Sequence, residues 1–148
     1  MTDTTDLGRP RIAVVADDLI WATRLGDGVR RAGGEPVAIR STAALEATLP
    51  TVKGAIVDLT ARAYDGIATV ALAAAAGIPV IAVGQHDDAE TRRAATAAGA
   101  SRVYAYRALF EHGDRVLGAW IETIAPTAQP PDTTEAPMPV TTTPEGVA

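Results

Sequence analysis

The sequence predicts an α/β fold built on a doubly wound parallel sheet with helices on both faces. Short runs rich in β-branched residues alternate with segments of helical periodicity. This alternation repeats five times, and Gly, Pro, Asp or Ser marks each change of element. A parallel sheet covered on both faces also explains why the expected strands are apolar throughout rather than alternately polar.

Each element has its own signal in the chain. The five apolar runs that we expect to form strands are residues 11–16, 36–39, 54–57, 79–83 and 102–106. The first helix carries Trp21, Leu25 and Val29 and stops at Gly33 and Gly34, and the next three helices cover residues 41–49, 66–76 and 88–98. In the last helix Leu117, Trp120, Ile121 and Ile124 share one face.

Composition sets the limits of this domain. The 148 residues are 47% hydrophobic and include no cysteine, so disulfide frameworks and cysteine-ligated metals are excluded. We expect residues 1–10 to be a flexible N-terminus and residues 11–125 to be the folded domain. Residues 126–148 are rich in Pro, Thr and acidic side chains without apolar periodicity, which predicts a disordered tail.

Charge and hydropathy argue against nucleic acid and membrane as partners. Most of the formal charge of −5 comes from the two ends of the chain, and the near-neutral domain between them offers no continuous basic stripe. The uncharged stretch 66–85 is long enough to span a membrane, but Gly77 and Pro79 divide it into a helix, a turn and a strand. The start of the chain has no signal-peptide pattern, so we expect a cytoplasmic protein.

Acidic residues follow two of the strands at the edge where doubly wound sheets bind ligands. Asp17 and Asp18 follow the first strand, and Asp58 follows the third. If these strands are neighbours, the three carboxylates can hold Mg²⁺, and Asp58 can act as a nucleophile towards a phosphoryl group. An equally strong alternative is that Asp17 or Asp18, like Asp65, caps the following helix.

By these residues the chain resembles the receiver domain of bacterial two-component response regulators. The resemblance covers residues 11–125 and rests on four stretches, which are 12–18, 58–66, 79–81 and 97–100. It implies a flavodoxin-like sheet in the order 2-1-3-4-5. It also implies that Asp58 is the phosphorylatable aspartate, that Asp17 binds the metal, and that the backbone carbonyl of Thr60 helps to hold Mg²⁺.

Three positions depart from the family pattern. Ala16 stands where the family has the first of two acids, although Asp18 is close enough to replace it. Gly84 replaces the hydroxyl residue that bonds the phosphoryl group, and Tyr106 replaces the lysine that pairs with the phosphorylated aspartate. Arg107 follows one position late, with a guanidinium of different geometry.

We therefore interpret the chain as an atypical receiver, or pseudo-receiver. It is expected to act by binding a signalling partner, a ligand or a second copy of itself, without enzymatic activity and with impaired or absent phosphorylation. The alternative is a stand-alone receiver phosphorylated on Asp58 with Mg²⁺, and a small enzyme or nucleotide binder ranks last because no Gly-rich phosphate loop is present. No cofactor is required, and any Mg²⁺ at Asp17, Asp18, Asp58 and the Thr60 carbonyl is expected to bind weakly.

An interface is expected on the surface that receivers commonly use to pair. Tyr104, Tyr106 and Arg107 lie there, and tyrosine and arginine are enriched at the centres of protein interfaces. Strand alternation predicts that one of the two tyrosines is instead buried against the last helix.

Overall fold

The computed structural model describes residues 9–85 and 87–124 of the chain. The predicted disordered tail lies outside these residues, as does the predicted flexible N-terminus apart from Arg9 and Pro10. Within the described ranges, no helix is both long enough and apolar enough to cross a membrane.

Five parallel strands form one sheet in the order β2-β1-β3-β4-β5, which confirms the predicted fold class. The strands are β1 (Arg11–Val15), β2 (Glu35–Ile39), β3 (Gly54–Asp58), β4 (Val80–Gly84) and β5 (Arg102–Ala105). The helices between them are α2 (Leu19–Arg31), α3 (Thr42–Thr48) with a short 3₁₀ turn (Leu49–Thr51), α4 (Gly66–Ala75), α5 (Ala89–Ala98) and α6 (Tyr106–Ile124).

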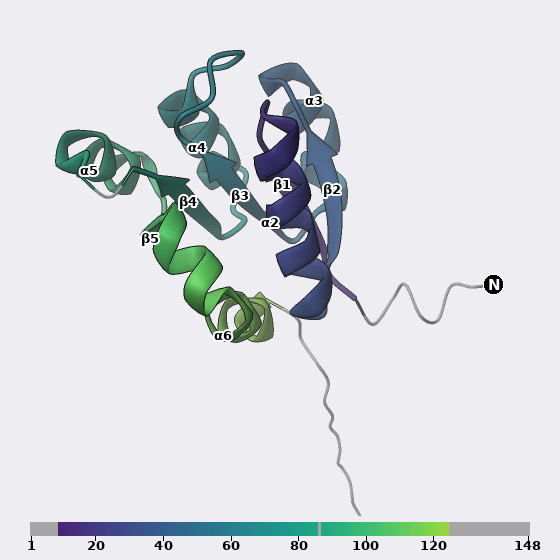
Figure 1. The fold of residues 1–148 in the computed structure, drawn as a ribbon. Helices are drawn as coiled ribbons and strands as arrows, with labels where there is room; N and C mark the ends of the chain where they lie inside the picture. The colour runs from purple at the N-terminus through teal and green to yellow at the C-terminus, as the bar shows by residue number, and fades with distance from the viewer. Residues whose placement is uncertain (1–8, 86, 125–148) are drawn as a thin grey trace, which may run out of the picture.

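The sheet has a separate apolar core on each face, as its alternating side chains require. On one face, Ile12, Ile56 and Ile81 pack against buried residues of α2 and α6. On the other face, Ala13, Val57 and Ala82 pack against α3, α4 and α5. Figure 1 shows the first of these layers, with α2 and α6 in front of the sheet.

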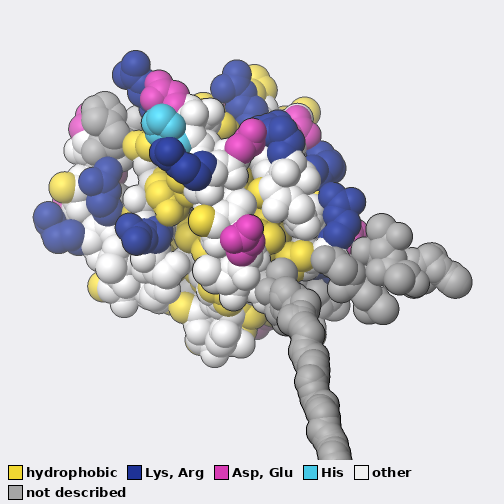
Figure 2. Space-filling view, turned by 90° about the horizontal axis from the view of Figure 1, so that it is seen from below, with side chains coloured by type: hydrophobic (Ala, Val, Ile, Leu, Met, Phe, Trp, Pro, Cys, Tyr) yellow, Lys and Arg dark blue, Asp and Glu magenta, His cyan; other side chains and the backbone are white. Residues whose placement is uncertain are grey.

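Charged side chains are dispersed over the surface. On the face seen from below, basic side chains stand at several separate places around apolar surface, with acidic side chains among them (Figure 2).

The junction between β5 and α6 differs from the prediction. The strand was expected to continue through Tyr106, but β5 ends at Ala105 and Tyr106 is the first residue of α6. No loop separates the two elements. The helix is also interrupted at His112, whose backbone angles (φ −125°, ψ 19°) are not helical, so residues 106–111 form a short first segment of their own.

Candidate functional site

The carboxyl ends of β1 and β3 lie side by side, as the sequence predicted. Val15 is in register with Val57, and Asp58 is the last residue of β3. Asp17 and Asp18 follow β1 at the same edge. Although all three aspartates therefore reach this edge, the structure gives each of them a different task.

Asp58 is almost completely enclosed, with 1% of its surface exposed. Its Oδ1 accepts hydrogen bonds from the Thr60 backbone N–H at 2.9 Å, the Thr60 hydroxyl at 2.8 Å and the Tyr106 hydroxyl. Its Oδ2 is also buried and has no hydrogen-bond partner. Thr60 thus binds Asp58 through its N–H and hydroxyl, whereas the sequence singled out only its carbonyl.

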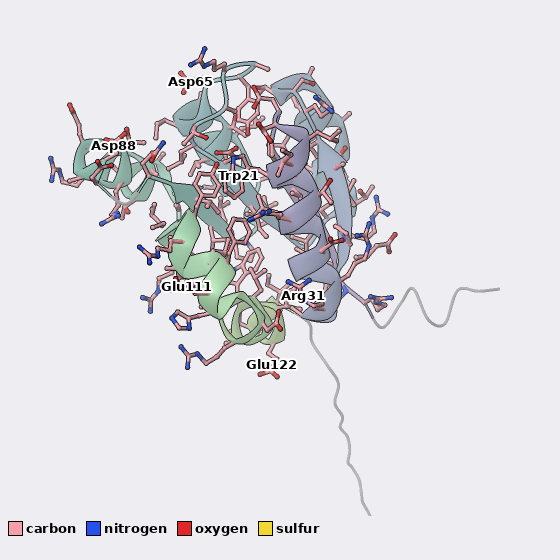
Figure 3. The ribbon with its side chains drawn as sticks, viewed as in Figure 1. Trp21, Arg31, Asp65, Asp88, Glu111 and Glu122 are labelled. Atoms are coloured by element: carbon pink, nitrogen blue, oxygen red, sulfur yellow. The ribbon has the colours of Figure 1, made fainter. Side chains whose placement is uncertain are left out.

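Tyr106 reaches Asp58 from the start of α6 and is the residue whose role the sequence did not predict. Its hydroxyl also lies 3.0 Å from the Thr60 hydroxyl. Its ring stacks on Trp21 of α2 with 4.1 Å between the ring centroids, and Trp21 in turn stacks on Phe110 at 5.1 Å. Figure 3 shows Trp21 in this position between α2 and α6.

Protonation of Tyr106 is favoured at this site. Burial is the largest cause that raises the pKa of its hydroxyl, and the hydrogen bond to Asp58 adds to it. The phenol therefore stays neutral and donates its proton. It supplies a hydrogen bond where the family has a lysine, but it supplies no positive charge.

Tyr64 is a buried residue that contacts the same edge of the sheet. Its buried hydroxyl lies 2.7 Å from the Val15 carbonyl oxygen and 3.0 Å from that of Asp58, so it can donate its single proton to either. Burial, followed by the negative charge of Asp58, raises its pKa well above the ordinary tyrosine value. Tyr64 is the one aromatic residue between Asp58 and Gly66, and this was the feature of the sequence that could have indicated a buried side chain here.

These two tyrosines predict a loss of stability in alkali. Because the pKa of each is raised on folding, their contribution is complete below the unfolded value near 10 and is lost as the pH rises beyond it. The slope is at most about 1.4 kcal/mol per pH unit for each tyrosine, and less for Tyr106 because solvent screens its partly exposed side chain.

Urea unfolding of the wild type, Tyr64→Phe and Tyr106→Phe at pH values from about 9 to about 11 measures this effect. Each single variant should show a shallower decline than the wild type, and the double variant should show the shallowest. If the double variant lost stability with rising pH as steeply as the wild type, the two tyrosines would not be the cause of the alkaline loss.

The Asp17 side chain binds the backbone of a loop. Its Oδ2 accepts the backbone N–H groups of Arg62 and Ala63, both at 2.8 Å, and these bonds lower its pKa. The Arg40 guanidinium donates to the Asp17 carbonyl oxygen at 3.0 Å. Asp17 therefore ties the loop between β3 and α4 to the end of β1.

The helix-capping alternative is confirmed for Asp18 and Asp65, and Asp88 is a further N-cap of the same kind. Asp18 is the N-cap of α2, where its side chain accepts the N–H groups of Ile20 and Trp21. Asp65 caps α4 and Asp88 caps α5 in the same way.

The three aspartates expected to bind Mg²⁺ do not gather into one cluster of carboxylates, and the Mg²⁺ site stays a prediction. Residues 9–85 and 87–124 contain no group of three His, Cys, Asp or Glu residues that could hold a metal ion. Asp17 and Asp18 are bound to backbone N–H groups, and Asp58 directs its accepting oxygen at Thr60 and Tyr106. The arrangement does not fit a divalent cation shared by the three carboxylates.

The other altered positions, Gly84 and Tyr106, lie at the ends of β4 and β5. Gly84 ends β4, and a Cβ built there would lie 3.6 Å from the Leu59 side chain, which is ordinary contact. Gly84 and Tyr106 line one open pocket of about 430 Å³ at the ends of β4 and β5. No hydroxyl from this strand end is available to Asp58.

The predicted interface residues are divided by the structure. Tyr104 packs against the core beneath α2 and α6, and Tyr106 turns towards Trp21 and Asp58. Arg107 is the exposed member of the set, with 86% of its side chain accessible and its guanidinium paired with Glu111 at 3.0 Å. Arg107 accordingly does not take the place of the missing lysine at Asp58.

The fold and topology are those of the flavodoxin-like receiver domains of response regulators. The Mn²⁺-bound form of response regulator Rcp1 superposes with a TM-score of 0.66 at 17% identity, covering 80% of this chain and 99% of that one. A CheY-like receiver domain protein from Methanospirillum hungatei JF-1 gives a TM-score of 0.62 at 20% identity and covers 78% of this chain and 98% of that one.

A third solved structure is that of a response regulator from Burkholderia pseudomallei with a phosphorylated aspartic acid, a calcium ion and citrate. It gives a TM-score of 0.64 at 17% identity and covers 78% of this chain and 70% of that one. No protein-family model and no curated protein matches the sequence. At these identities the likeness establishes the fold.

Proposed function

We propose that the chain is a receiver-like signalling module that binds a protein partner and whose Asp58 does not operate a phosphoryl switch. The observation that carries this proposal is that the Asp58 carboxylate is already hydrogen-bonded within the protein. Its Oδ1 already accepts three hydrogen bonds from Thr60 and Tyr106, and its Oδ2 is buried. In this proposal the domain transmits its signal by binding, without catalysing a reaction.

The electrostatics around Asp58 support the same proposal. Among the described residues, no ion pair includes Asp58, and the group at the lysine position is a neutral phenol. A phosphoryl group on Asp58 would add negative charge without a cation to pair with it. It would also find no hydroxyl at Gly84, so the two conformations of a switch would differ little in their affinity for it.

Two exposed side chains support a role in binding. Leu19 and Ile20, at the start of α2, are 67% and 65% exposed, and these are the large apolar residues that stand out on the described surface. Adjacent apolar side chains left in water favour a partner that covers them. We propose that a protein partner covers Leu19 and Ile20. The alternative is that a second copy of the chain covers them, which sedimentation would detect as self-association.

The phosphoryl proposal is tested with a small phosphodonor, and with beryllium fluoride as its mimic, in the presence of Mg²⁺. We expect no mass increase on Asp58 and no saturable change in the amide NMR signals of α5, β5 and α6. A receiver with all family residues in the same buffer serves as the positive control. A saturable change spreading from Asp58 to Tyr106 would establish the alternative, a phosphorylatable receiver that uses Asp58.

A further inference from the structure

The Tyr106 side chain donates a hydrogen bond to the buried Asp58 carboxylate from a partly exposed position. The side chains that bond the Asp58 carboxylate are those of Thr60 and Tyr106, and Thr60 is an exposed residue at the surface of the loop. Tyr106 is partly buried and brings a complete aromatic ring to the same oxygen. This ring is therefore the larger of the two side chains that bond the buried carboxylate.

The ring is held from its other side by α2. Trp21 stacks on Tyr106 with an angle of 23° between the ring planes, and on Phe110 with an angle of 7°. The guanidinium of Arg24 lies 5.5 Å from the ring centroids of both Trp21 and Phe110, a cation–π arrangement at the outer end of the stack. Stacked aromatic pairs are favourable beyond the apolar area that they bury, so Trp21 anchors Tyr106 in place.

The backbone allows this placement because α6 starts directly at Tyr106. If the strand had continued, alternation would have fixed the direction of the side chain relative to the sheet. The first segment of α6, residues 106–111, ends at the non-helical His112 and carries both Tyr106 and Phe110 against Trp21.

From these contacts we infer that Tyr106 is a lid over Asp58, held closed by its stack on Trp21. The ring excludes solvent and reagents from the carboxylate, and the hydroxyl fixes the ring over Oδ1. The inference deepens the proposed function, since it names the residue that keeps Asp58 out of reach. It also makes access to Asp58 depend on α2, the helix that begins with the exposed Leu19 and Ile20.

Carboxyl labelling of the full chain tests the lid directly. A carbodiimide adds to an accessible carboxylate, and the amine of glycine ethyl ester then displaces the activated oxygen as a urea, leaving an amide on the side chain. Trypsin afterwards releases residues 54–62, in which Asp58 is the single acidic side chain. The peptide of residues 12–24 contains Asp17 and the exposed Asp18, and its labelling is the internal positive control.

In the wild type we expect the Asp58 peptide to remain unlabelled while the Asp18 peptide reacts. Tyr106→Ala should raise Asp58 labelling at least about tenfold, because reactivity follows the population of open states. Trp21→Ala should raise it by a smaller factor, since the ring remains but loses its anchor. Tyr106→Phe keeps the ring and its stack but loses the bond that fixes the ring over Oδ1, so its labelling should rise by less than that of Tyr106→Ala.

Trp120→Ala is the matched control for loss of an indole. Trp120 lies beside Gly54, at the opposite end of β3 from Asp58. Its replacement by alanine should therefore not change the labelling of Asp58. An equal rise in Trp120→Ala and Tyr106→Ala would mean general loosening and would overturn the lid. Unchanged labelling in a folded Tyr106→Ala would overturn it as well, and if circular dichroism shows that this variant does not fold, Trp21→Ala decides in the same way.

The lid and the proposed function fail by different results. Phosphoryl transfer to Asp58 of the wild-type chain would end the proposed function. Unchanged labelling in the lid variants would end the lid and leave the proposed function standing.

Discussion

Replacing Asp58 with alanine should destabilise the fold by about 2–4 kcal/mol, the largest effect expected at the site. The substitution leaves three donors without their acceptor, which are the N–H and hydroxyl of Thr60 and the hydroxyl of Tyr106. The Thr60 hydroxyl can rotate towards water because Thr60 is exposed, whereas its backbone N–H is fixed in direction and loses its acceptor. The partly buried Tyr106 hydroxyl keeps only the Thr60 hydroxyl, 3.0 Å away, as a partner, and its lost bond to the carboxylate adds to the cost.

Asp58→Asn is the matched control for this prediction. An amide oxygen can accept the same three hydrogen bonds, whereas the NH₂ group brings two donors to the buried position of Oδ2, where no partner is present, at a cost in stability. The substitution also removes a buried charge that no described ion pair compensates. We therefore expect Asp58→Asn to remain within about 1 kcal/mol of the wild type.

Urea unfolding followed by Trp fluorescence measures both variants. Equal stability of Asp58→Ala and the wild type would show that the hydrogen bonds at Oδ1 contribute nothing, and the reading of Asp58 as a structural acceptor would be wrong. A large loss in Asp58→Asn alone would instead point to the charge as the important property.

The fold could be predicted because its signals are local and repeated. Five apolar runs with helical segments between them leave few arrangements other than a doubly wound sheet. The capping roles of Asp18 and Asp65 were also open to prediction, since an N-cap bonds N–H groups two or three residues along the chain.

The site could be predicted only in part, because its contacts join distant segments. Asp17 bonds backbone groups about 45 residues away, and no local pattern distinguishes this from metal binding. For Tyr106, the sequence indicated that a lysine was missing but not what the phenol does instead. Its direction depends on whether residue 106 ends a strand or begins a helix, and element boundaries are the least certain part of a sequence prediction.

Asp17→Ala should lower stability by about 1–2 kcal/mol, after allowing for solvent around this partly exposed carboxylate. The loss comes from the N–H groups of Arg62 and Ala63, which give up a charged acceptor at the start of the loop that carries Tyr64. Asp17→Asn can still accept these bonds without the charge, so we expect it to lose less.

The pH dependence separates loop anchoring from metal binding. Because folding lowers the pKa of Asp17, its contribution is present above the unfolded value near 3.9 and is lost as the pH falls through the lower folded value. The wild type should therefore lose this increment of stability below about pH 4, whereas Asp17→Ala lacks it at every pH. If Asp17 were a metal ligand, the result would be the opposite. In EDTA, Asp17→Ala would relieve repulsion between carboxylates and be more stable than the wild type. In Mg²⁺, the wild type would be stabilised by the bound ion and Asp17→Ala would not. For each protein, the unfolding curve in EDTA should superpose on its own curve in Mg²⁺ if Asp17 serves the loop, because the backbone donors that Asp17 binds do not depend on the ion.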